Sequence, residues 1–170
     1  MLATVKQFLQ NVAAESGRTA LYNIFYPMAD RYSSQTLTNA GLAIKAGGSA
    51  VVKAGSAIYA LASGTLVTKT ANTDMAALSG TVTNAKFNVF CFYIDSAGNL
   101  TSQMGTEGAT LAAVVMPTVP AGKAQIGFVV INPTGTGDFV GGTTPLDDAT
   151  VVPNAAYVNT VSVFDQTVLP

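Results

Sequence analysis

The pattern of apolar and polar residues changes character near residue 38. Before that point, apolar residues recur every three or four positions, which is the spacing of one face of an α-helix. The first such stripe consists of Leu2, Val5, Phe8, Leu9 and Val12. The second consists of Leu21, Ile24, Phe25 and Met28. We expect Gly17 to interrupt the helical pattern between the stripes, and Pro27 argues against a long second helix because proline lacks a backbone donor.

Aromatic residues are concentrated at the start of the chain. Five of the fourteen aromatics, which are eight Phe and six Tyr, fall within the first 32 positions, too many for a disordered tail. Two interpretations remain open: this segment packs on its own domain, or it is an arm that docks on a neighbouring subunit or partner through aromatic anchors. The candidate interface residues are Leu2, Val5, Phe8, Leu9, Val12, Leu21, Tyr22, Phe25, Tyr26 and Tyr32.

From about Leu42 onward the chain consists of short segments of β character separated by Gly, Asn, Asp and Pro. The segment IKAG at 44–47 is echoed by VKAG at 52–55. A single echo is too little for a solenoid, so we interpret it as consecutive hairpin strands that each end at glycine. Further strands are expected over 57–62, 66–70, 100–104, 111–116, 125–131, 139–142 and 156–164.

The segment 87–94 is the strongest predicted strand. Alternation places two apolar sets on opposite faces, namely Phe87, Val89, Cys91 and Tyr93, and Phe90, Phe92 and Ile94. Only Asn88 is polar, so both faces should be covered. Residues 95–99 then predict a hairpin turn, because Asp, Gly and Asn tolerate positive φ.

Seven to nine short strands at regular spacing predict a mainly β protein. The expected architecture is an antiparallel sandwich or small barrel, jelly-roll-like, preceded by a partly helical N-terminal arm. We assign residues 1–38 to the arm, with assembly contacts, and residues 39–170 to the β-sandwich or barrel domain.

Charge is scarce along the whole chain. Charged residues make up 10% of it, against about 25% in an ordinary soluble domain. Such a surface suits a protein that packs against copies of itself or a partner. The eight basic residues are scattered and the net charge is −1, so no basic stripe predicts nucleic-acid binding.

The remaining sequence signals concern the compartment. Residues 1–10 contain Lys6 and lack a continuous apolar core, so they do not resemble a signal peptide. No run approaches 18 apolar residues, so we expect no membrane partner. Cys91 is the single cysteine and excludes an internal disulfide. We expect synthesis and assembly in a reducing interior.

Candidate catalytic chemistry is sparse. The chain has no His, so Cys91 has no imidazole base to activate it. Asp147 and Asp148 are adjacent, do not converge on one bond in a strand, and fit a solvated turn. Asp138 and Asp147 sharing a calcium ion is a weak alternative, since two ligands are few. We expect no enzyme activity, cofactor or metal.

The C-terminal third carries a resemblance. Residues 119–128 (VPAGKAQIGF) resemble a segment recurring in phage virion proteins, in which a Pro-Ala-Gly-Lys turn enters a strand. Residues 138–147 (DFVGGTTPLD) and 157–159 (YVN) follow in the same order. The chain is thus similar to the small head proteins of tailed bacteriophages known as decoration, cement or head-fibre proteins. The resemblance covers roughly residues 40–165 and is clearest from 119 to 159.

This resemblance implies a non-enzymatic β-rich protein that binds the outside of an icosahedral shell, commonly as a homotrimer. The implied partners are the major capsid protein and further copies of the chain. The implied location is the capsid surface of a virion assembled in the host cytoplasm. Residues 1–38 lie outside the similarity, so their capsid-binding role rests on composition alone.

Two other functions would make different demands on the sequence. A head-fibre or tail component that binds host-surface carbohydrate would need exposed aromatics on its outward loops. The loops 95–99, 134–137 and 141–148 contain none, and Phe139 is the nearest. A pilin or surface adhesin would need a signal peptide.

Overall fold

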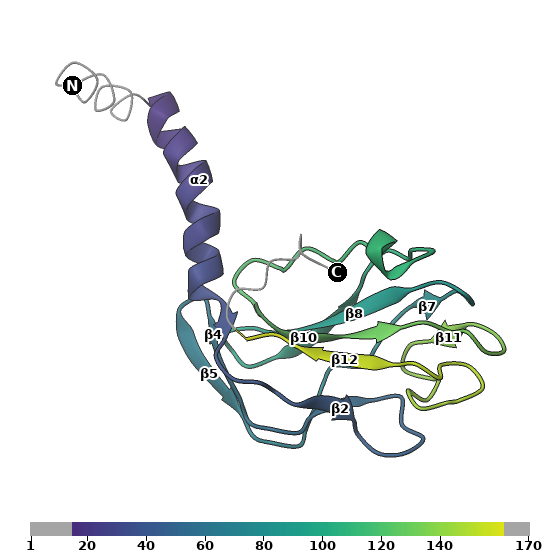
Figure 1. Cartoon of the computed structure of the whole chain (residues 1–170). Coiled ribbons are helices and arrows are strands. Elements are labelled where there is room, and N and C mark those ends of the chain that lie inside the picture. Colours follow the sequence, from purple (N-terminus) through teal and green to yellow (C-terminus); the bar gives the residue numbers. More distant parts are fainter. Residues whose placement is uncertain (1–14, 162–170) are drawn as a thin grey trace.

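The computed structural model describes residues 15–161 and shows a β fold from which one helix projects (Figure 1). Helix α2 spans Glu15–Ser33 and leads directly into the two-residue strand β1 (Gln35–Thr36). All strand pairs between the named strands are antiparallel. The sheets are open and are not closed into a barrel. The predicted mainly β, antiparallel fold with a preceding helical segment is confirmed, and the barrel alternative is wrong.

The strands of the described residues form four sheets. The largest has the order β12-β10-β8-β9, and is built from β8 (Asn88–Ile94), β9 (Leu100–Met104), β10 (Ala124–Ile131) and β12 (Ala156–Asn159). The sheet β1-β4-β5 adds β4 (Ile58–Ala62) and β5 (Thr65–Lys69). The sheet β2-β3-β6 contains β2 (Leu42–Ile44), β3 (Val52–Ala54) and β6 (Thr73–Asp74). The last pair is β7 (Thr81–Val82) with β11 (Phe139–Val140).

Strand β8 is buried along its whole length between two apolar clusters. Its residues Phe90, Phe92 and Ile94 belong to the larger cluster, and Val89, Cys91 and Tyr93 to the smaller one. The prediction that both faces are covered is confirmed. Asn88 is buried as well, and its side-chain Nδ2 donates to the carbonyl oxygen of Gly105 at 3.1 Å. That bond lets a polar residue occupy the central strand at low cost.

The predicted hairpins are present. Ile44 lies opposite Val52, so the two echoing segments pair as β2 and β3. β4 and β5 are joined by Ser63 and Gly64, with φ of 48° and 74°. Positive φ at both turn residues is typical of the type I′ turn that matches the strand twist. β8 and β9 are joined by 95–99, where Asp95 Oδ1 accepts from the backbone N–H groups of the turn.

The strand predicted over 111–116 is wrong. This segment forms a 3-10 helix (Leu111–Ala113) followed by extended chain. Val114 is buried against the smaller cluster, whereas Val115 is exposed. The segment therefore covers the second face of β8 as a loop. Leu111, Val114 and Met116 pack against this face of β8. An apolar run in the sequence cannot by itself distinguish a covering loop from a strand.

Helix α2 also differs from the prediction. It contains both Gly17 and Pro27, so neither residue breaks it within the described range. Proline removes the donor that would bond to the carbonyl four residues earlier. An exposed helix can satisfy that carbonyl with water, which explains how α2 continues past Pro27.

Two other segments begin or end at different residues from those that the sequence pattern indicated. β1 pairs with β4, and Thr36 Oγ1 donates to the carbonyl oxygen of Gln125 at 2.7 Å, so the chain enters the β fold at Gln35. The strand predicted over 156–164 ends at Asn159, and its last three residues lie outside the described residues. The short strands β1, β6 and β7 were not predicted, because a strand of two residues is too short to show an alternation of apolar and polar positions.

Candidate docking surface on helix α2

Half of the predicted interface residues can be placed. Leu21, Tyr22, Phe25, Tyr26 and Tyr32 lie on α2. Leu2, Val5, Phe8, Leu9 and Val12 lie outside the described residues.

The aromatic residues of α2 are exposed. Relative exposure is 61% for Tyr22, 59% for Phe25, 54% for Tyr26 and 68% for Tyr32, whereas Leu21 is half-buried. The rings of Tyr22 and Tyr26 stack with their centroids 5.0 Å apart, one helical turn from each other. The spacing of these four residues places them on one side of the helix. We call this set the aromatic face of α2.

The C-terminal end of α2 is bound to the β4–β5 hairpin. The backbone N–H of Gly64 donates to the carbonyl oxygen of Ser33 at 2.8 Å, and that of Ser63 donates to Ser34 Oγ at 3.1 Å. The first bond satisfies the carbonyl of Ser33, one of the groups that a helix end leaves unpaired. α2 therefore leaves the hairpin in a set direction and points away from the sheets (Figure 1). The aromatic face is presented to the outside.

Two residues of α2 weaken it. A proline within a helix costs about 3 kcal/mol or more, and a glycine costs about 1 kcal/mol. Pro27 and Gly17 both lie inside the helix. Helices in proteins derive most of their stability from packing an apolar face, so covering the aromatic face would stabilise α2.

Cys91 and Tyr93 form a buried titratable pair inside the β fold. Burial raises the pKa of the Cys91 thiol to about 12, and a hydrogen bond with Tyr93 opposes the shift. Burial, together with the neighbouring Cys91, raises the pKa of Tyr93 as well. A thiol is nucleophilic only as the thiolate. Cys91 is therefore a small apolar core residue at neutral pH.

The carboxylates of the β fold join loops to one another. Both carboxylate oxygens of Glu107 accept hydrogen bonds from Thr83, one from its backbone N–H and one from its hydroxyl. Asp138 accepts from the backbone N–H of Asn84 at 2.8 Å. Across residues 15–161, no three His, Cys, Asp or Glu side chains form a group with metal-ligating geometry.

Asp147 and Asp148 lie in a turn, as predicted. Asp147 accepts from the backbone N–H of Gly48 with both oxygens, at 3.1 and 3.0 Å, and so joins this turn to the β2–β3 loop. Asp148 accepts from the hydroxyl and the backbone N–H of Thr150, which lowers the pKa of its carboxyl. Asp138 and Asp147 thus accept hydrogen bonds from different loops, and this arrangement does not support a calcium ion shared between them.

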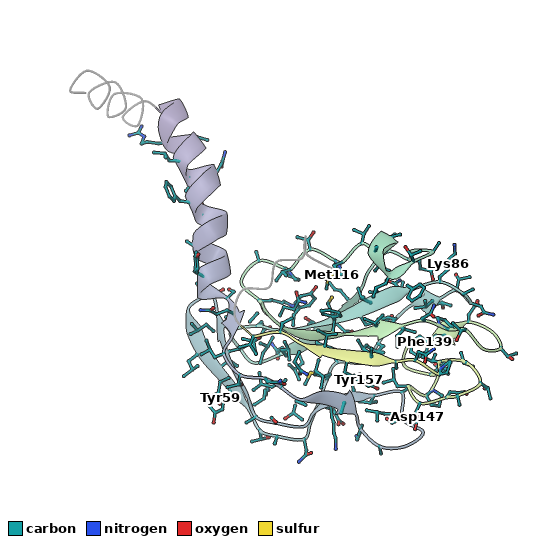
Figure 2. All side chains as sticks on the ribbon, in the orientation of Figure 1. Tyr59, Lys86, Met116, Phe139, Asp147 and Tyr157 are labelled. Carbon is teal, nitrogen blue, oxygen red and sulfur yellow. The ribbon has the colours of Figure 1, made fainter. Side chains whose placement is uncertain are left out.

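A second exposed apolar area was not found from the sequence. Leu37, Tyr59 and Leu66 are exposed on the outer side of the sheet β1-β4-β5. Figure 2 shows Tyr59 on the outside of the β fold, whereas Phe139 lies in its interior. In β4, Ile58, Ala60 and Ala62 are buried, but the strand is apolar at every position, so no alternation in the sequence indicated its outer face.

No protein-family model, curated protein or solved structure matches the chain. Within the described residues, no helix is both long and apolar enough to cross a membrane.

Proposed function

We propose that this protein is a non-enzymatic structural protein that binds the outer surface of a phage capsid as a homo-oligomer and stabilises the shell. The aromatic face of α2 is the surface that docks on the capsid. One observation carries the proposal: four aromatic side chains, each more than half exposed, stand on a helix that projects from the β fold.

The size of the aromatic face supports an interface. An aromatic side chain buries about 150–250 Å² when it is covered. At the observed exposures, the four rings present roughly 500 Å² for docking, and a standard interface buries about 800 Å² per partner. The rings thus supply a large part of one interface and belong to the residue types that dominate binding energy.

The capsid as partner is supported by the sequence resemblance. The similar segments lie in and around β10, β11, the turn that contains Asp147, and β12, all within the β fold. The resemblance therefore concerns the scaffold, while α2 supplies the contact. The low charge of the chain fits a surface that is covered in the assembled particle.

Capsid binding can be tested by co-sedimentation. The purified full-length protein is mixed with heads of the phage that encodes it, prepared without this protein. In the test variant, Tyr22, Phe25, Tyr26 and Tyr32 are all replaced by alanine, which is a strong helix former. We expect its affinity for the heads to fall at least about 100-fold, because each buried anchor contributes about 1–2 kcal/mol.

Matched controls separate the aromatic face from general apolar exposure. Tyr59→Ala and Val115→Ala remove exposed apolar side chains from the β fold and should bind like the wild type. Undiminished binding by the quadruple variant would contradict the docking role of α2. Failure of the wild-type protein to sediment with the heads would contradict the capsid as partner.

A further inference from the structure

Strand β5 forms the open edge of its sheet. In the order β1-β4-β5 it pairs with β4 alone. The edge strands of the largest sheet are bonded to other segments of the same chain. On β9, Ser102 Oγ donates to the carbonyl oxygen of Ala77. On β12, Asn159 Oδ1 accepts from the backbone N–H of Leu42. Among the described residues, no comparable bond reaches the outer edge of β5. Figure 1 shows β5 at the margin of the fold, below the base of α2.

The hairpin geometry decides which backbone groups face that edge. Ala62 and Thr65 flank the two-residue turn and form the first hydrogen-bonded pair. Hydrogen-bonded and non-hydrogen-bonded pairs alternate along an antiparallel ladder. The N–H and C=O groups of Leu66 and Thr68 therefore point away from β4, into the open edge.

This edge lacks the usual protection. Natural proteins block exposed edges with charges, prolines, bulges or very short strands. β5 is five residues long, contains no proline and keeps an unbroken register with β4. Its one charged residue, Lys69, stands at the end of the strand. The edge is therefore available for strand addition.

We propose that β5 pairs antiparallel with β5 of a second copy of this chain, about a two-fold axis at Val67. In this register Leu66 lies opposite Thr68 of the second copy, and Thr65 lies opposite Lys69. No like charges meet, so the edge is complementary to itself, which is the property an isologous contact requires. The two Leu66–Thr68 pairs would supply about four backbone hydrogen bonds.

The contact is small, so each pair is weak on its own. Its effect would come from repetition, since many such pairs in a symmetric assembly act by multivalency. The pairing rests on the homo-oligomer of the proposed function and names a contact between its copies, and this contact does not involve α2.

Disulfide trapping tests the register directly. Val67 is the position that meets its own copy, with Cα atoms about 4.5–5.5 Å apart, within disulfide range. We expect Val67→Cys to form a disulfide-linked dimer under mild oxidation. The native Cys91 is fully buried in the central strand β8 and should not contribute, whereas Val67 is 8% exposed and lies on the edge strand itself. The control is Tyr59→Cys, whose thiol is more exposed and lies on β4. In the proposed dimer the two copies of β4 are about 14 Å apart, too far for a disulfide.

Charge exchange tests the pairing partners. Leu66→Lys with Thr68→Lys, added to Val67→Cys, puts like charges opposite each other and should abolish the dimer. Leu66→Glu with Thr68→Glu should do the same. Mixing the two variants at low salt should restore a mixed dimer. Both positions are exposed, so thermal melting should confirm that each variant folds.

Several outcomes would overturn the pairing. One is the absence of a Val67→Cys dimer at protein concentrations that saturate capsid heads. Another is cross-linking of Tyr59→Cys to the same extent as Val67→Cys. The third is cross-linking of Val67→Cys that is unchanged by the introduced charges. The Leu66→Lys and Thr68→Lys variant should still bind heads through α2. Loss of pairing and loss of capsid binding are thus separate results.

Discussion

The backbone N–H of Gly64 lies 2.8 Å from the carbonyl oxygen of Ser33, and this bond joins the end of α2 to the β4–β5 turn. Gly64 reaches that position because its φ is 74°, in the left-handed region. The direction of α2 therefore depends on the conformation of a two-residue turn.

Replacement of Gly64 by alanine should lower the free energy of unfolding by about 1 kcal/mol, because an L-residue is strained at positive φ. No atom lies within 4 Å of the added Cβ, so the effect isolates backbone strain. Urea denaturation measures it. Gly47→Ala is the control, since its Cβ would also be uncrowded and no positive φ is required, and it should change stability by less than about 0.5 kcal/mol.

Gly127→Ala should destabilise the protein more than Gly64→Ala, by about 3 kcal/mol or more. The added Cβ would lie 2.3 Å from the carbonyl oxygen of Val158 and 2.6 Å from Leu42 Cδ1. The backbone oxygen belongs to the neighbouring strand β12 and cannot move without breaking the ladder. Urea denaturation of both variants makes the comparison, and equal losses would show that β12 shifts freely.

Alkaline pH should destabilise the fold through the buried pair Cys91 and Tyr93. Burial raises the folded pKa of Cys91 from 9.0 to about 12, so its contribution is complete below pH 9 and is lost as pH rises toward 12. Tyr93 adds to the loss at higher pH. Above pH 9, the free energy of unfolding should fall by up to about 1.4 kcal/mol per pH unit as Cys91 titrates. Chemical denaturation from pH 7 to 11 measures the slope.

The control for the alkaline loss is Cys91→Ala, which removes one titrating group. Its slope between pH 9 and 10 should be shallower than that of the wild type, whatever its stability at pH 7. An unchanged slope would assign the loss to other groups.

The carboxyl of Asp95 should titrate below its ordinary value. Hydrogen bonds from the side chain and backbone of Asn99 lower the pKa of Asp95 from 3.8. The stability it contributes is therefore present above pH 3.8 and is lost as pH falls through the lower folded pKa. NMR titration of the Asn99→Ala variant should show the Asp95 pKa moving up toward 3.8. Lys123→Ala removes a weaker influence and should move it less.

The parts of the fold that were predictable have local causes. The hairpins β2–β3 and β8–β9 follow from alternation and turn residues that lie close in the sequence. Burial of both faces of β8 follows from seven residues with one polar exception. These signals depend on neighbours along the chain and need no knowledge of distant packing.

The missed parts depend on tertiary contacts. Val114 and Met116 cover β8 from a loop, a role that an apolar run at 111–116 shares with a strand. Pro27 argued against a long second helix, but α2 continues through it. For the candidate docking surface, composition singled out the aromatic residues, but the predicted apolar stripe of the second helix contained only Phe25 of them. Their exposure could not be deduced, because it depends on where α2 points after Ser33.

The junction between α2 and the hairpin also defines how force would travel through the molecule. A pull on the helix would pass from Ser33 to the β4–β5 turn, and along the chain to Thr36, whose hydroxyl is bonded to the carbonyl oxygen of Gln125 on β10. Strand β10 is bonded on both sides, to β8 and β12. Tension on the arm would thus be shared by the central sheet, and would not be borne by a single peripheral loop.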